Sequence, residues 1–91
     1  MNKTRRKGIF SIRQGLDMLK SSLDFNLEKV RNVLDDEIDA HDNTPENLQS
    51  SDRYESAEDC IDCMSDAESE LEEAVRNLES SIASLDEALD S

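Results

Sequence analysis

The sequence predicts an all-α protein built as an antiparallel, coiled-coil-like hairpin of two helices, which we expect homo-oligomerisation to complete. Apolar residues in the C-terminal half recur with a period of seven, alternately three and four positions apart, which is typical of a helical seam. The N-terminal part shows a similar apolar spacing. Because the connection between the two parts is short, the helices should fold back on each other.

We expect residues 1–8 to form a flexible basic arm and residues 9–91 to form one domain, with helix 1 over about residues 9–39. The positions expected to face helix 2 are Ile12, Leu16, Leu19, Leu23, Leu27, Val30, Leu34 and Ile38. A sparser set on a different face is predicted to be an oligomer stripe: Phe10, Met18, Phe25 and Val33. The alternative is that this set consists of scattered surface residues, which are common.

An acidic bend is expected at residues 40–51. Thr44 is a favourable N-cap and Pro45 suits the first turn of a helix, so we predict a single turn over residues 45–49. Asp52, followed by Glu55 three residues later, then indicates the N-terminal cap of the next helix.

Helix 2, expected over about residues 52–90, carries the clearest repeat. In heptad notation Val75, Ile82 and Leu89 occupy position a, and Leu71, Leu78 and Leu85 occupy position d. The g positions are small residues, namely Cys60, Ala67, Ala74, Ser81 and Ala88. Small residues there widen the apolar face and allow another helix to approach closely.

The hairpin also predicts a register, in which facing residues have numbers that sum to about 92–94. This register places Glu68, which interrupts the a positions of helix 2, opposite Asn26 in a polar layer. It brings Arg13 near Glu79, Lys20 near Glu72, and Arg5 and Arg6 near Asp86 and Glu87.

Charge is distributed unevenly along a chain whose formal net charge is −13. Residues 1–31 have a net charge of +5 and residues 32–91 a net charge of −18. Acidic surfaces repel nucleic acid and anionic membranes and suit a protein with a basic surface. The predicted partner-binding residues of the acidic tip are Asp35, Asp36, Asp39, Asp42, Glu46, Asp52, Glu55 and Asp59. The candidate phosphate contacts are Arg5, Arg6, Arg13 and Lys20, and direct DNA binding is expected only through the basic arm.

No catalytic constellation is present in the sequence, so we expect no enzyme, no metal and no cofactor. Cys60 and Cys63 form a C-x-x-C inside a predicted helix, where we interpret both as small packing residues, with Cys60 on the seam. A zinc site needs four ligands, which would require two chains. The single histidine, His41, lies among bend carboxylates, and this cluster is interpreted as a solvated loop rather than a cation site.

Composition also bears on location. No apolar run reaches the roughly 18 residues of a membrane-spanning helix, and the N-terminus has no apolar leader segment. Two cysteines without an export signal fit a reducing compartment. We therefore expect the cytoplasm of a bacterial host and no association with a membrane.

The segment from Asp42 to Glu55, DNTPENLQSSDRYE, is followed by Ala57-Glu58 and the leucine–acid repeats. Together these residues resemble small acidic helical-hairpin proteins of bacteriophages and integrative elements of Gram-positive bacteria. The resemblance covers about residues 30–90. It implies a mobile-element setting and does not imply a particular activity.

The function expected from these features is non-enzymatic binding of a host or phage protein through the acidic helical surface. Its sharper form is inhibition of a nucleic-acid-handling defence protein by DNA mimicry. One alternative is an oligomeric sponge that sequesters a nucleotide immune signal on converging basic residues. Another is a structural coiled-coil adaptor or assembly chaperone.

Overall fold

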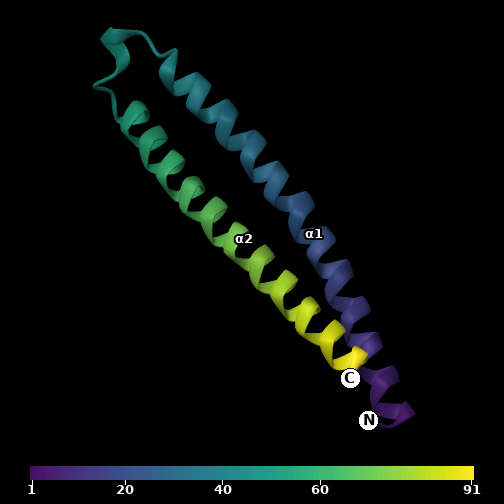
Figure 1. Ribbon diagram of the computed structural model, residues 1–91. Helices are drawn as coiled ribbons and strands as arrows, with labels where there is room; N and C mark the ends of the chain where they lie inside the picture. The colour runs from purple at the N-terminus through teal and green to yellow at the C-terminus, as the bar shows by residue number, and fades with distance from the viewer.

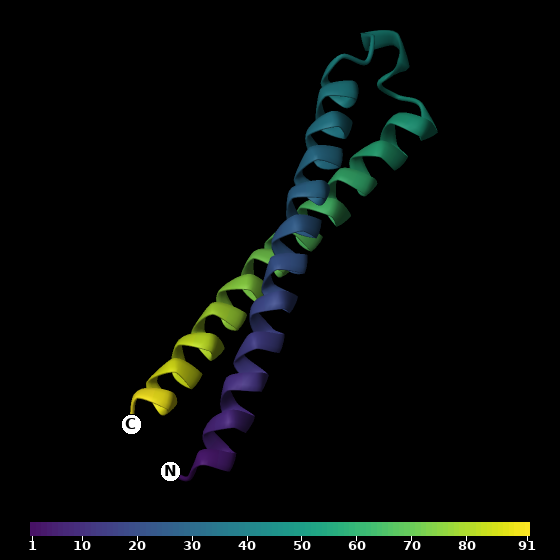
Figure 2. The ribbon, with the colours of Figure 1, turned by 90° about the vertical axis from the view of Figure 1, so that its right-hand side faces the viewer.

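The computed structural model describes residues 1–91 as a hairpin of two long helices (Figure 1). Helix α1 spans Lys3–Asp42, the 3₁₀ helix η1 spans Glu46–Leu48, and helix α2 spans Asp52–Asp90. The molecule is a rod of 70 × 15 × 15 Å. After a quarter turn the two helices cross near the middle of the rod (Figure 2). The predicted all-α, antiparallel hairpin is confirmed.

Helix α1 begins six residues earlier than the sequence analysis places it. The side chain of Asn2 accepts a hydrogen bond of 2.8 Å from the backbone N–H of Arg5, and Asn is among the best N-cap residues. Residues 3–8, which were expected to be a flexible arm, therefore form the first turns of α1. Neither Gly8 nor Gly15 interrupts the helix, and both have negative φ.

The bend is capped by other residues than those predicted. Thr44 does not cap the short turn, because its hydroxyl donates to the carbonyl of Ala40 at 3.1 Å. Helix α2 is capped by Ser51, whose hydroxyl oxygen accepts from the N–H of Tyr54 at 3.2 Å, so the prediction of an Asp52 cap is wrong by one residue. The expected single turn is present as η1.

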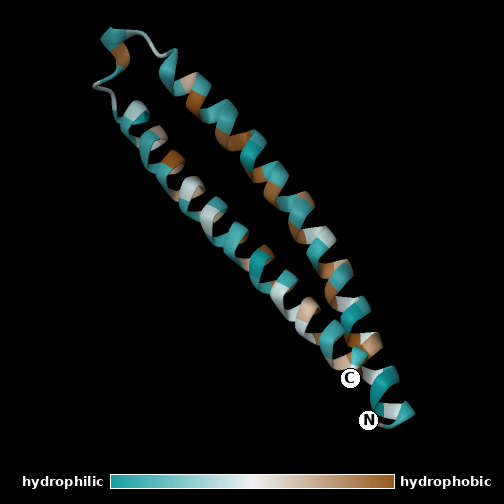
Figure 3. Cartoon of the chain, in the orientation of Figure 1, coloured by the Kyte–Doolittle hydropathy of each residue, from teal (hydrophilic) through white to brown (hydrophobic).

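The buried core is small and lies in the middle of the rod. Leu27, Leu34, Val75 and Ile82 are the four buried residues, each 5–8% exposed. Within each helix the two residues are seven apart, so each pair lies on one heptad row. Figure 3 shows hydrophobic residues recurring along both helices between hydrophilic ones, without a continuous apolar layer.

Ile12 and Leu19 do not face α2, contrary to the prediction, and are 57% and 51% exposed. Counting back in sevens from Leu27 gives Lys20 and Arg13, which lie on the row of buried residues. Near the open end of the hairpin this row is therefore basic. The long stems of Arg and Lys cover apolar surface while their charged groups reach water or a carboxylate.

The register differs from the predicted one by one heptad at two ion pairs. Arg13 pairs with Asp86 at 2.6 Å rather than with Glu79, and Lys20 lies 3.5 Å from Glu79 rather than beside Glu72. Side chains in a helix lean toward its N-terminus. In an antiparallel pair, each side chain therefore meets a residue that lies further along the other helix than the residue directly opposite its own Cα atom. The two residue numbers of such a pair add up to more than those of two residues at the same height along the rod.

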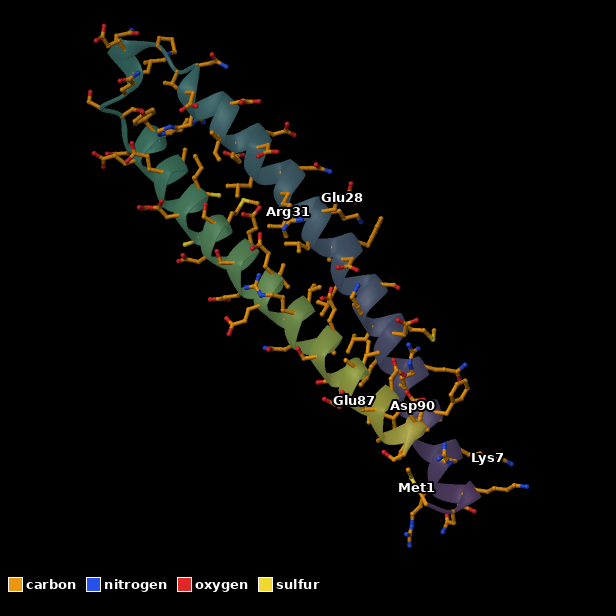
Figure 4. All side chains as sticks on the ribbon, viewed as in Figure 1. Met1, Lys7, Glu28, Arg31, Glu87 and Asp90 are labelled. Carbon is orange, nitrogen blue, oxygen red and sulfur yellow. The ribbon has the colours of Figure 1, made fainter.

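The predicted polar layer of Asn26 and Glu68 is not formed. The side-chain amide of Asn26 donates to the carbonyl of Ser22 within α1 at 2.8 Å. Glu68 instead lies 3.5 Å from Arg31, which also bonds to Glu72 at 2.8 Å. Figure 4 shows Arg31 near the middle of the rod, between the two helices.

Neither long helix contains an apolar stretch of the length that a membrane-spanning segment needs.

Candidate functional site

The acidic tip is the end of the rod where α1, η1 and α2 meet. All eight predicted residues are exposed: Asp35, Asp36, Asp39, Asp42, Glu46, Asp52, Glu55 and Asp59. None of them takes part in an ion pair, although Arg13, Lys20 and Arg31 form five ion pairs along the rod. On the heptads of α1 and α2 the seven helical members occupy positions b, c and f, which face away from the partner helix. The tip is therefore a solvated, unneutralised surface.

Helix polarity acts differently on the two sides of the tip. Asp39 and Asp42 lie in the last turn of α1, where the helix dipole is negative and disfavours further negative charge. Asp52 and Glu55 lie in the first turn of α2, where the dipole is positive and favours it. The acids of the two helices thus form one surface but have opposite effects on the helices that carry them.

Inside the bend, His41 and Tyr54 hold the two helices together. Their rings stack with centroids 4.0 Å apart and an interplanar angle of 19°. The Nε2 atom of His41 is buried and lies 3.4 Å from a carboxylate oxygen of Glu58, without the alignment of a hydrogen bond. A pocket of about 550 Å³ adjoins this stack, lined by the end of α1, the bend and the start of α2.

The four candidate phosphate contacts do not converge. Arg6 donates to the backbone oxygens of Leu89 and Ser91 at the end of α2. The hydrogen bond and the charge of Asp86 raise the pKa of Arg13. The pKa of Lys20 is raised mainly by its 3.0 Å hydrogen bond to Asp24, with a further contribution from Glu79.

Of those four residues, Arg5 is the one whose side chain has no hydrogen-bond or ion-pair partner. Figure 4 shows Lys7 at the same end of the rod, projecting outward, with Glu87 and Asp90 on the neighbouring end of α2. Arg6 and Arg13 thus bind groups of α2, whereas the side chains of Arg5 and Lys7 at this end have no such partner.

The four residues of the predicted oligomer stripe are all exposed, by 52% for Phe10, 76% for Met18, 59% for Phe25 and 50% for Val33. They do not form one row, because on the heptad of α1 they occupy positions e, f, f and g. Lys29 covers the ring of Phe25, with its Nζ atom 4.4 Å from the ring centroid. Val33 instead shares its row with Ile12 and Leu19, which the sequence analysis assigned to the seam.

The cysteines show no special environment. Both Cys60 and Cys63 are unpaired and exposed, so the placement of Cys60 on the seam is wrong. No three potential ligands among His, Cys, Asp and Glu side chains come together as a metal site would require.

Sequence reasoning misplaced Ile12 and Leu19, which it assigned to the seam although both are exposed. A count in sevens through residues 12, 19, 26 and 33 would have found them as a separate row, since three of its four members are large and apolar.

No protein-family model, curated protein or solved structure matches this chain.

Proposed function

We propose that this chain is a non-enzymatic binding protein whose acidic tip engages a basic surface of another protein. The observation that carries the proposal is that every residue of the tip is exposed and free of ion pairs. Arg13, Lys20 and Arg31, in contrast, all pair with carboxylates along the rod. An unneutralised cluster has a strong local field, which accelerates and orients association with a partner of opposite charge.

The sharper proposal is that the tip occupies the nucleic-acid groove of a defence protein. Along α1 the four predicted acids between Asp35 and Asp42 span about 10 Å of helix axis. This is one charge per about 3 Å, close to the roughly 3.4 Å between phosphates along one DNA strand. The mobile-element setting implied by the sequence resemblance would supply such a target.

The sponge alternative is less well supported. It needs basic side chains that are free to converge on phosphate groups, whereas Arg6, Arg13 and Lys20 are bonded to groups of the same chain. Binding a phosphate would require these contacts to break.

The test is a competition measurement with a defined probe. A purified basic DNA-binding protein is loaded with fluorescently labelled duplex DNA, and displacement of the duplex by the hairpin is followed by anisotropy. The variant D35N/D36N/D39N/D42N should displace the duplex at least about tenfold less well, because it removes four of the charges that attract the basic groove.

The matched control is E70Q/E73Q/E87Q/D90N. It changes the net charge equally, and its four residues are exposed, lie outside the tip and form no ion pair. It should displace the duplex within about twofold of the wild type if the tip is the contact surface. Equal weakening by both variants would show that net charge, rather than the tip, governs binding. Absence of displacement by the wild type would reject DNA mimicry.

A further inference from the structure

The seam between the two helices has two unlike edges. The carboxylates that meet α1 across the seam lie in a single row of α2, together with the adjacent Glu68. Glu58 lies beside His41, and Glu72, Glu79 and Asp86 form ion pairs with bases of α1. The row members are 14, 7 and 7 residues apart, so they lie on one side of α2 at heptad position e. We call this side the charged edge.

The opposite side is apolar and uncovered. On α1 it carries Ile12, Leu19 and Val33, which are 57%, 51% and 50% exposed and are 7 and 14 residues apart. The fourth member of the row, Asn26, satisfies its side-chain amide within α1. In an antiparallel helix pair, the g positions of both helices flank the same edge of the seam, and on α2 these positions include Ala67, Ala74 and Ala88. We call this side the apolar edge.

Burial follows the same division. The four buried residues, Leu27, Leu34, Val75 and Ile82, all occupy position a, which borders the charged edge. The residues at position d, which borders the apolar edge, are only half-buried: Leu16, Leu23, Val30, Leu71, Leu78 and Leu85. Long ion-paired side chains cover one side of the seam, and nothing in the chain covers the other.

The hairpin exposes more surface than a compact monomer of its mass, 6739 Å² against about 5,400 Å². The excess of roughly 1,300 Å² belongs to the whole rod, and packing a second copy along the apolar edge removes part of it. A standard interface buries ~800 Å² from each partner. Large side chains along α1 beside small ones along α2 also allow the side chains of another helix pair to interdigitate.

We propose that a second copy of this chain packs on the apolar edge in antiparallel orientation, forming a four-helix bundle. Charge selects the direction in which a second copy packs. Residues 35–62 have a net charge of −10, whereas the open end, residues 1–13 with 79–91, has a net charge of +1. A parallel dimer would place two bends within a Debye length of about 10 Å. An antiparallel dimer places each bend beside the open end of the partner.

The arrangement is a two-fold one in which both copies use the same patch. It does not depend on the binding proposed for the acidic tip, because the tip residues lie on outward heptad positions. Its consequence is a particle with one acidic tip at each end of a rod about as long as the 70 Å hairpin.

Substitutions at two neighbouring positions of α1 test whether the apolar edge is the dimer interface. Leu19→Glu places a charge on the apolar edge, and Met18→Glu places the same charge one residue away on the outer surface of α1, where Met18 is 76% exposed. Sedimentation equilibrium should show a wild-type dimer of twice 10.3 kDa. We expect Leu19→Glu to raise the dimer dissociation constant more than about 100-fold and Met18→Glu to change it less than about threefold.

A second measurement tests the orientation of the two copies. A spin label is attached at Glu46→Cys in a C60S/C63S background, and the distance between the two labels of the dimer is measured by pulsed electron paramagnetic resonance. The antiparallel bundle predicts labels separated by about the length of the rod, 70 Å. A monomeric wild type, dissociation by Met18→Glu but not by Leu19→Glu, or labels close together would each overturn the proposal.

Discussion

The two ends of the hairpin differ in whether their carboxylates form ion pairs. At the open end Asp86 and Glu79 meet Arg13 and Lys20, and Arg6 binds the last backbone oxygens of α2. At the bend the eight tip acids are exposed and have no ion-pair partner. The same chain thus forms ion pairs near its open end and leaves the acids of the bend unpaired. The difference shows that the position of the bases along the chain, rather than the total charge, decides which acids are available to a partner.

The largest effect is expected from the core residue nearest the bend. Leu34→Ala should lower the free energy of unfolding by about 2–5 kcal/mol, as core truncations of this type do, because Leu34 is one of four buried residues. Urea unfolding at fixed protein concentration measures this. Leu48→Ala is the control, since Leu48 is 50% exposed in η1, and it should cost far less. Similar losses for both variants would mean that the bend turn, and not the seam, holds this end together.

A smaller effect of opposite sign is expected from the acids that end α1. Replacing Asp39 and Asp42 by Asn removes repulsion between residues three apart and an unfavourable interaction with the helix dipole, so stability should rise by about 1 kcal/mol at low salt. Asp52→Asn should lower stability, because Asp52 lies in the first turn of α2. Thermal unfolding with and without 0.5 M salt checks both, and salt should shrink both differences. This account would be refuted if the Asp39/Asp42 variant and Asp52→Asn changed the stability in the same direction.

The smallest effect concerns the ion pairs of the open half. Asp24 and Glu79 raise the pKa of Lys20, so the folded state holds this proton more tightly than the unfolded state. The resulting stability is present below the ordinary value of 10.5 and is lost as pH rises through the raised pKa. The melting temperature of the wild type should therefore exceed that of Lys20→Gln at pH 8, and the gap should close as the pH rises beyond the raised pKa. Since the other titrating groups are common to both proteins, a gap that persists at high pH would contradict the prediction.

The helices themselves could be predicted from the sequence because their apolar repeats are long and regular. The start of α1 could also have been predicted, since Asn2 is a favourable cap. The register was harder to predict, because it depends on the direction in which long side chains lean and not on the heptad alone. The exposure of Ile12 and Leu19 depends on Arg13 and Lys20 occupying the seam row, which a hydrophobic pattern does not reveal.

The residues of the acidic tip could be predicted from the sequence, but whether they form ion pairs could not. A run of acids shows that charge accumulates near the bend, yet only the paths of the helices decide which bases can reach it. Arg31 precedes the tip in the sequence, but its guanidinium turns toward Glu68 and Glu72 in the middle of the rod. The placement of Arg31 leaves the tip without that base.

The acidic residues that flank the turn, between it and the buried core, also affect how the chain folds. A helical hairpin brings together residues near its turn at the lowest cost in loop entropy, and more distant pairs cost more. Here the His41–Tyr54 stack closes the turn, but the acids around it repel one another, and the first buried side chains lie beyond them at Leu34 and in the middle of α2. Formation of the buried seam therefore brings like charges together. We expect added salt to speed refolding, because screening acts on the charges that are forced together before the seam can form.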